Sequence, residues 1–292
     1  WSAIMSEDVY ITPPSYLPVI GSVALLLIAV GVGRWLHGSA YALLFVGAGL
    51  ALLVWMIVAW FSTVIHEGKT VFKDDASSDR AFRIGMLWFI FTEITFFLAF
   101  FGVLFYIRAW ALPQLSGEVA SKMMTHTLLW PDFSYSWPLM ENPDPSIVAP
   151  QTAMEVAGIP AFNTLVLLTS GLTVTLSHHA LLKQHMTSAV RWLVLTVLLG
   201  FLFIYMQAIE YGHAYQVGLT LSSGIYGNIF FMMTGFHGLH VLIGSVILLV
   251  VAYRMQRGDF TKSTHFAFEA STWYWHFVDV VWLALFVFVY WI

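Results

Sequence analysis

Seven long runs of apolar residues dominate this sequence, and they constrain its fold more than any other feature. A helix needs about 20 mostly apolar residues to cross the hydrocarbon core of a membrane. The runs are Leu17–Gly33, Ala40–Ile65, Ala81–Ala109, Gly158–Leu182, Ala189–Ile209, Gly224–Tyr253 and Phe266–Ile292. They are continuous, whereas strands of a membrane β-barrel alternate apolar and polar residues over about ten positions. We therefore predict an all-α, polytopic membrane protein with seven transmembrane helices.

The composition excludes several other classes of protein. Hydrophobic residues make up 59% of the 292 residues and charged residues only 10%, whereas a soluble domain is about 45–50% apolar, glycine included, and ~25% charged. So few charges cannot cover a soluble enzyme or keep a chain disordered. The 12 Lys and Arg against 16 Asp and Glu leave no basic face for a nucleic acid. Because cysteine is absent, disulfides, thiolate zinc sites and cysteine nucleophiles are excluded too.

Basic residues in the connections predict the orientation, because cytoplasmic loops are enriched in Lys and Arg. We call side A the side on which the N-terminus lies, and side B the opposite side. Side A receives nine basic residues: Lys69, Lys73, Arg80, Arg83, Lys183, Arg191, Arg254, Arg257 and Lys262. Side B receives three: Arg34, Arg108 and Lys122. We therefore expect a cytoplasmic N-terminus and a C-terminus outside.

Two connections stand out between the predicted helices. Residues 67–80 carry charges of both signs and are typical of a solvated linker on side A. Residues 110–157 lie on side B and are much longer than a typical connection. Their Pro and aromatic residues indicate a folded loop. It either caps its own helix bundle or forms a docking surface for a partner subunit.

Ionisable residues lie inside three of the predicted spans, where each costs roughly 2.5–3.5 kcal/mol or more. They are Glu93 in the third span, His237 and His240 in the sixth, and His276 and Asp279 in the seventh. At 1.5 Å per residue, Glu93, His240 and Asp279 all fall about 18–20 Å from side A. Three interpretations are open: the groups satisfy one another, relay protons or bind a buried metal ion, although the Glu-x-x-His pairs of a di-iron bundle are absent.

A second histidine group, in "SHHALLKQH", lies at the side A end of the fourth span. It consists of His178, His179 and His185. The spacing is similar to one histidine box of a membrane di-iron hydroxylase, but such sites need several boxes. An interfacial cluster facing lipid headgroups and a proton-collecting surface are the other interpretations, since histidine titrates near neutral pH.

Four motifs give this chain a specific resemblance. They are "RIGMLWFIFTEITFF", "FNTLVLLTSGLTVTLSHHAL", "GIYGNIFFMMTGFHGLHVLIGS" and "STWYWHFVDVVWLALFVFVYWI". In this order the sequence resembles cytochrome c oxidase subunit III from about Tyr16 to Ile292. The two Trp-Pro steps of the long connection are similar to a bacterial branch of that family.

The resemblance implies a fold. Seven transmembrane helices would stand in a 2+5 arrangement with a V-shaped cleft filled by lipid. Residues 1–66 would form the two-helix bundle, residues 67–80 a cytoplasmic linker and residues 81–292 the five-helix bundle, including the periplasmic loop 110–157.

The resemblance also implies a function. The chain would be the non-redox subunit III of a proton-pumping oxidase in a bacterial inner membrane, with its C-terminus periplasmic. It would stabilise subunit I, bind phospholipids and support proton uptake during aerobic respiration. Haem and copper would lie in partner subunits, subunit II would receive electrons from cytochrome c, and nucleic acid would play no part.

Site residues carry over by motif. The intramembrane carboxylate of the third helix would be Glu93, and the cytoplasmic histidine pair would be His178 and His179. The lipid contacts would be Glu67, Arg83, Arg254, Arg257 and Thr261. No catalytic residue and no metal ligand are implied in this chain.

Three alternatives remain at this point. A quinol oxidase or nitric oxide reductase has a related subunit, but it usually has five helices and lacks the first two. An autonomous metal or haem enzyme would use His237, His240 and His276. A transporter would need a broken helix, and none is evident.

Overall fold

The chain is built from helices alone in the part that the structure describes. The computed structural model describes residues 14–70, 76–262 and 264–292, so part of the predicted linker 67–80 lies outside the described residues. The long helices are α1 (Leu17–Leu36), α2 (Ala42–Thr70), α3 (Ala76–Tyr106), α6 (Ile159–Leu182), α7 (Met186–Gln216), α8 (Ile225–Gln256) and α9 (Phe266–Leu285), the last continued by η3 (Phe286–Trp291). Within these described ranges seven helices are long and apolar enough to span a membrane, which confirms the predicted all-α membrane fold.

The helices extend beyond the apolar runs that predicted them. After α3 the helix continues through η1 (Ile107–Ala111) and α4 (Leu112–Leu115), so this span covers Ser77–Leu115. The boundary of the predicted loop 110–157 was therefore wrong at its start. At 1.5 Å per residue the span is about 58 Å long, against ~30 Å of hydrocarbon. Apolarity marks only the part inside the hydrocarbon, whereas backbone hydrogen bonds continue the helix into the polar region.

The described chain divides into two compact units, residues 1–78 and residues 79–292. In the first unit α1 packs along α2. A Cβ atom at Gly49 would lie 2.7 Å from the Ile28 side chain, and one at Gly31 would lie 2.7 Å from Val46. Small residues let membrane helices approach closely, which is how lipid-embedded helices gain contact without a hydrophobic driving force.

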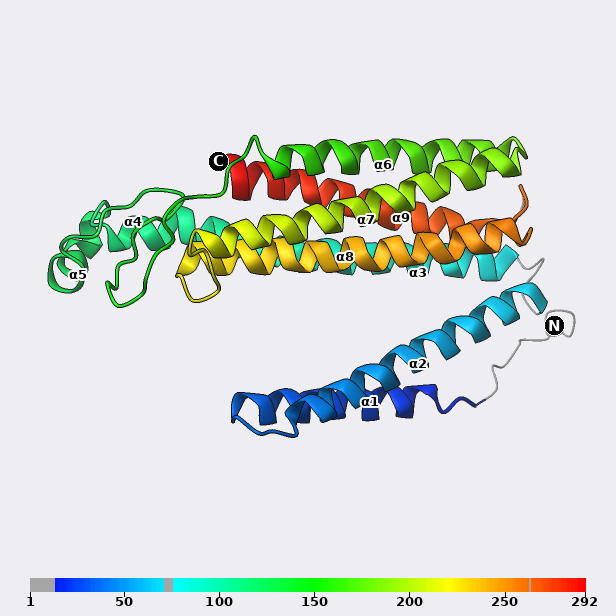
Figure 1. Cartoon of the computed structure of the whole chain (residues 1–292), viewed down its shortest axis with the longest axis horizontal. Coiled ribbons are helices and arrows are strands. Elements are labelled where there is room, and N and C mark those ends of the chain that lie inside the picture. Colours follow the sequence, from blue (N-terminus) through cyan, green and yellow to red (C-terminus); the bar gives the residue numbers. More distant parts are fainter. Residues whose placement is uncertain (1–13, 71–75, 263) are drawn as a thin grey trace, which may run out of the picture. The chain divides into compact units, whose positions relative to one another are not determined.

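The second unit packs α6 against α7, α7 against α8, and α9 against both α6 and α8 (Figure 1). Trp275 of α9 lies at the centre and is fully buried. Its ring fills space left by glycines on two neighbouring helices. A Cβ at Gly200 of α7 would lie 2.7 Å from the ring, and one at Gly244 of α8 would lie 2.9 Å from it. The apolar core of this unit is therefore fixed by a tryptophan inserted between two glycine sites.

Helix α3 joins this unit mainly through aromatic side chains. Ring centroids lie 5.2 Å apart for Phe96 and Phe236 of α8, and 6.0 Å apart for Phe97 and Phe277 of α9. Only Phe97 and Leu104 are fully buried among the described residues of α3. Large side chains hold the α3 backbone away from its neighbours, which leaves room for a groove between α3 and α9.

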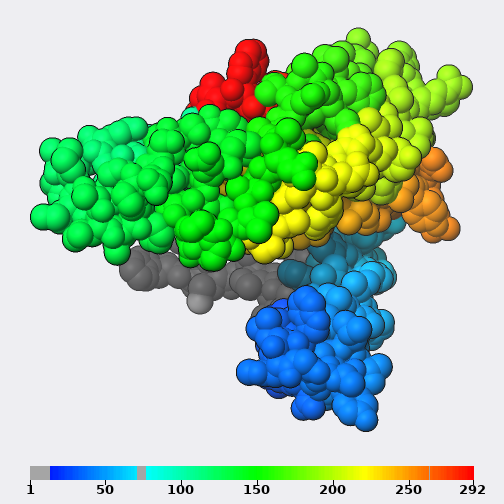
Figure 2. Space-filling view, turned by 60° about the vertical axis from the view of Figure 1, so that its left-hand side comes forward, coloured from blue at the N-terminus to red at the C-terminus, as the bar shows by residue number. Residues whose placement is uncertain are grey.

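The segment between α4 and α6 includes η2 (Ala120–Lys122) and α5 (Met123–Leu129). It forms the continuous green surface in Figure 2. Leu139 is buried, the Trp137 ring lies 5.7 Å from that of Tyr226 on α8, and the Met154 backbone N–H donates to the Tyr226 hydroxyl at 3.3 Å. These contacts favour the interpretation of a cap over its own bundle.

Candidate functional site

The five ionisable residues predicted inside the membrane do not form one cluster. Four of them form two pairs at different helix interfaces, and the fifth, His237, belongs to neither pair. Glu93 meets His240 across α3 and α8. His276 meets Asp279 within α9, against α6. His237 bonds to the backbone of α9. The depth comparison thus brought together Glu93 and His240 correctly but did not reveal that Asp279 turns toward a different helix.

The Glu93–His240 pair links α3 to α8. His240 Nε2 lies 2.9 Å from Glu93 Oε2, and His240 Nδ1 lies 2.6 Å from the carbonyl oxygen of Phe236, one turn earlier. Because a carbonyl only accepts, Nδ1 carries a hydrogen and donates it. The bond between Nε2 and the carboxyl oxygen then needs one more hydrogen, on either atom. The pair therefore holds one bridging proton and carries no net charge, which suits a membrane interior.

The His276–Asp279 pair lies against α6 and has the same proton requirement. The Thr175 hydroxyl donates to the Gly171 carbonyl at 2.9 Å, so it accepts from His276 Nε2 at 3.2 Å. His276 Nδ1 lies 3.3 Å from Asp279 Oδ2, and this contact again needs one bridging proton. Gly171 provides the space, because a Cβ there would lie 2.5 Å from Asp279 Oδ2.

His237 is a fully buried core histidine. Its Nε2 donates to the Val278 carbonyl at 3.2 Å, and its ring lies 5.1 Å from Trp282 and 5.5 Å from Phe203. Its Nδ1 has no hydrogen-bond partner among the described residues. The aromatic neighbours leave this histidine in a packing role between α7, α8 and α9.

Sequence analysis missed a third buried acidic group, Glu210. The predicted fifth span ended at Ile209, but α7 continues to Gln216 and buries the Glu210 side chain completely. Gln207 Nε2 donates to Glu210 Oε2 at 2.9 Å, and the Tyr290 hydroxyl of η3 lies beside both side chains. A glutamine one turn before a glutamate, at the end of an apolar run, was the signal that could have identified this cluster.

Two of the three arginines predicted to contact lipid at side A, Arg83 and Arg254, already have carboxylate partners. Arg83 Nε lies 2.7 Å from Asp79, and its Nη1 lies 2.9 Å from Glu269 of α9. Arg254 Nε lies 3.2 Å from Asp259. These pairs tie helix ends together, and each arginine retains further N–H groups for an anion.

The other predicted lipid contacts are placed separately. Arg257 lies 5.0 Å from the ring of Tyr253, and Thr261 shares a hydrogen bond of 2.7 Å with Thr264. Glu67 lies on α2, which belongs to the first compact unit. The arginines and Thr261 therefore gather at the side A end of α3, α8 and α9, while Glu67 is described within its own unit.

The predicted histidine surface at side A is divided. The His178 ring is partly buried and lies 5.4 Å from that of His265 and 5.6 Å from Phe268 of α9. His179 is exposed, and His185 precedes α7 as its N-cap residue. Only His179 and His185 thus offer open imidazoles, whereas His178 packs against the start of α9.

These contacts also show which side chains are available to bind a metal ion. Within residues 14–70, 76–262 and 264–292, no three His, Asp or Glu side chains converge on a point that could hold a metal ion. The imidazoles of His240 and His276 use both ring nitrogens on neighbouring protein groups. What this arrangement offers is paired acid and base groups that join helices inside the membrane.

The fold and these pairs define a class: a polytopic helical membrane protein whose ionisable groups within the spans are hydrogen-bonded in pairs, between helices or within one helix. Comparison with known proteins gives the family. The family model for cytochrome c oxidase subunit III matches residues 8–128 and 134–292. The chain belongs to the cytochrome c oxidase subunit III family.

Curated relatives agree along the length of the chain. It is 40% identical over 282 residues to cytochrome c oxidase subunit 3 of Squalus acanthias, covering 97% of this chain and 96% of that protein. It is 39% identical to the same subunit of Polypterus ornatipinnis with the same coverage. The subunit of Scyliorhinus canicula is 38% identical and covers 99% of this chain and 98% of its own length.

Proposed function

We propose that this chain is the non-redox subunit III of a proton-pumping cytochrome c oxidase. The observation that carries the proposal is that the likeness to this subunit extends along almost the whole chain, both helices of the first unit included. A five-helix relative from a quinol oxidase would lack those two helices. In this function the chain binds subunits I and II, which hold the haem and copper, and reaches cytochrome c only through them.

The paired groups support a stabilising role in this proposal. Each pair keeps its ionisable groups neutral as a unit inside the membrane while joining two helices. A bundle held in this way offers subunit I a rigid surface. Of the predicted pair, the exposed His179 would gather protons while His178 packs beside it, and the side A arginines would hold phospholipid headgroups, because histidines exchange protons near neutral pH and cations attract phosphates.

The two compact units would form the 2+5 arrangement, with phospholipids in a cleft between residues 1–66 and residues 81–292. Arg83 and Arg254 would contact those phosphates with the N–H groups that their carboxylate partners leave free. The excess of basic residues on side A supports a cytoplasmic N-terminus and a periplasmic C-terminus in a bacterial inner membrane.

A reduced-minus-oxidised visible spectrum tests the proposal. The complex is captured in mild detergent through a tag on this chain. Haem a bands together with two larger partner chains are the expected result. Haem b alone would favour the quinol-oxidase relative, and metal or haem bound to the isolated chain would favour an autonomous enzyme.

A further inference from the structure

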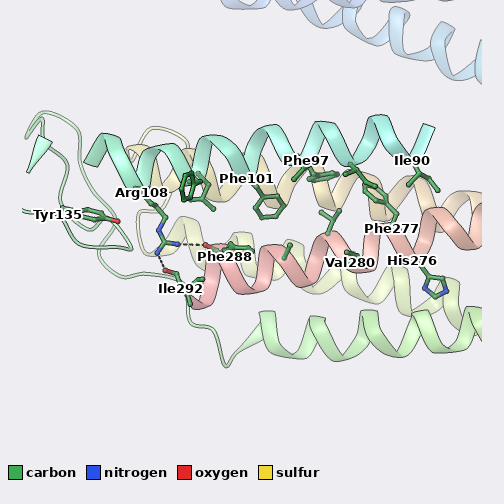
Figure 3. Close-up of a pocket in the computed structure, with 17 residues that line it drawn as sticks. Ile90, Phe97, Phe101, Arg108, Tyr135, His276, Phe277, Val280, Phe288 and Ile292 are labelled. Atoms are coloured by element: carbon green, nitrogen blue, oxygen red, sulfur yellow. Dashed lines mark hydrogen bonds between the residues drawn. The ribbon is translucent and has the colours of Figure 1, made fainter. Parts of the chain in front are cut away.

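An apolar groove runs between α3 and α9 within the second unit (Figure 3). Its volume is about 980 Å³, and its walls are almost entirely aliphatic and aromatic, from Ile90 to Arg108 on one side and from His276 to Ile292 on the other. His276 shows carbon atoms to the groove, because Thr175 and Asp279 occupy both of its ring nitrogens. Among the described residues that line the groove, Arg108 is therefore the side chain that offers a charge to a ligand.

Arg108 lies where the third span leaves the membrane on side B. Twenty-seven residues separate it from Ala81, or about 40 Å of helix, which matches the ~40–45 Å between the two headgroup layers. Its guanidinium donates to the peptide carbonyl oxygen of Phe288 and to the terminal main-chain oxygen of Ile292, and it lies 4.9 Å from the ring of Trp137. No side-chain carboxylate among the described residues pairs with it, and three of its five N–H groups are left for a ligand.

The geometry points to a phospholipid site in this groove, which we propose as a second lipid site, separate from the residues proposed to bind lipid on side A. The phosphate binds the guanidinium of Arg108, and one acyl chain lies between α3 and α9 toward Phe277. The charge of the headgroup complements the single cation, which sits at headgroup depth. The hydrocarbon walls match the chain.

The dimensions of the groove suit a hydrocarbon chain. From Ile90 to Arg108 the groove is about 27 Å long, and apolar side chains line it along this length. A partner helix on the same walls is the competing occupant, and the cross-linking described below distinguishes the two.

A photoreactive phosphatidylglycerol, with a diazirine on its acyl chain, tests the site. It is incorporated into the membrane before the complex is purified through a tag on this chain, and the labelled peptides are mapped by mass spectrometry. We expect labelling within residues 90–105 and 280–288. A neutral diacylglycerol carrying the same tail should label these peptides about tenfold less, because it lacks the phosphate.

Matched variants separate headgroup binding from the groove. Arg108→Gln should lower this labelling about tenfold, and Arg108→Lys should retain most of it, because the positive charge remains. Ala284→Phe fills the groove and should remove the label while Arg108 stays in place. Arg191→Gln removes an exposed cation on side A and should change nothing.

Each outcome decides the proposal. Equal labelling by the two probes, or labelling unchanged in Arg108→Gln, would overturn it. Cross-linking of these peptides to a partner chain instead of the lipid would show that a protein covers the groove. Haem content is measured on the same sample. Because the groove belongs to this chain alone, loss of the oxidase partners would contradict the proposed function without removing the lipid label.

Discussion

Gly171→Ala tests whether the space left by Gly171 positions the Asp279 carboxyl group beside His276. A Cβ at this position would lie 2.5 Å from Asp279 Oδ2, whereas ordinary contact begins at 3.4 Å. The carboxyl group would have to retreat by about 0.9 Å. Its bond to His276 Nδ1 is already 3.3 Å long, so the movement breaks it.

The expected loss of stability combines three effects. A charge-assisted hydrogen bond contributes about 1.5–3 kcal/mol, and overpacking costs about 1–3 kcal/mol. Alanine recovers up to about 1 kcal/mol because it favours the helix more than glycine does. We expect a net loss of about 1.5–6 kcal/mol, which lowers the melting temperature of a unit of this size by roughly 3–24 °C.

Thermal unfolding of the purified complex, followed by tryptophan fluorescence, measures this loss. Gly102→Ala on α3 is the matched control, because no atom lies within 4 Å of the Cβ position there. Adding Asp279→Ala to Gly171→Ala should cost little more, since both changes act on the same contact. If Gly171→Ala and Gly102→Ala have the same melting temperature, the space at Gly171 is not what positions the Asp279 carboxyl group.

Three further predictions address other contacts. Glu93→Ala should destabilise the complex by about 1.5–3 kcal/mol, because it removes the hydrogen bond between α3 and α8. Glu93→Gln should largely preserve stability, because its amide donates to His240 Nε2. Equal thermal stability of the two variants would contradict this account of the bridging proton. Ser170→Ala removes the acceptor 3.0 Å from Trp275 Nε1, and the unpaired indole N–H should cost about 1–3 kcal/mol in denaturant unfolding; Ser170→Thr is the control that keeps the hydroxyl. In the side B segment, the Ser146 backbone N–H donates to the Asp144 carboxylate and lowers the pKa of Asp144 below its ordinary 3.8. Because the pKa is lower in the folded state than in the unfolded state, the charged carboxylate stabilises this turn at neutral pH. The stabilisation is lost as the pH falls through the lowered pKa. Hydrogen exchange of residues 144–147, corrected for its intrinsic pH dependence, should show this loosening in the natural chain and not in Asp144→Ala.

Part of the candidate site could be predicted from the sequence. The positions of Glu93 and His240 along their apolar runs place both near mid-membrane, and the structure joins them at 2.9 Å. Depth alone could not reveal that Asp279 faces Gly171 of α6, because rotation of a helix about its axis depends on which neighbours its side chains fit. Glu210 was missed because apolarity ends at Ile209, while the helix continues to Gln216 and buries the Glu210 side chain.

The sequence by itself determined the number of spans and the membrane environment, because each segment that crosses a bilayer must be long and apolar enough on its own. Only the tertiary structure decided which polar groups meet and where space remains. Trp275 fills the gaps at Gly200 and Gly244, while the phenylalanines of α3 hold its backbone away from α9 and leave the groove. Such contacts depend on shape between residues far apart in the chain. Hydropathy carries no information about shape, because lipid tails are as apolar as the side chains that compete with them.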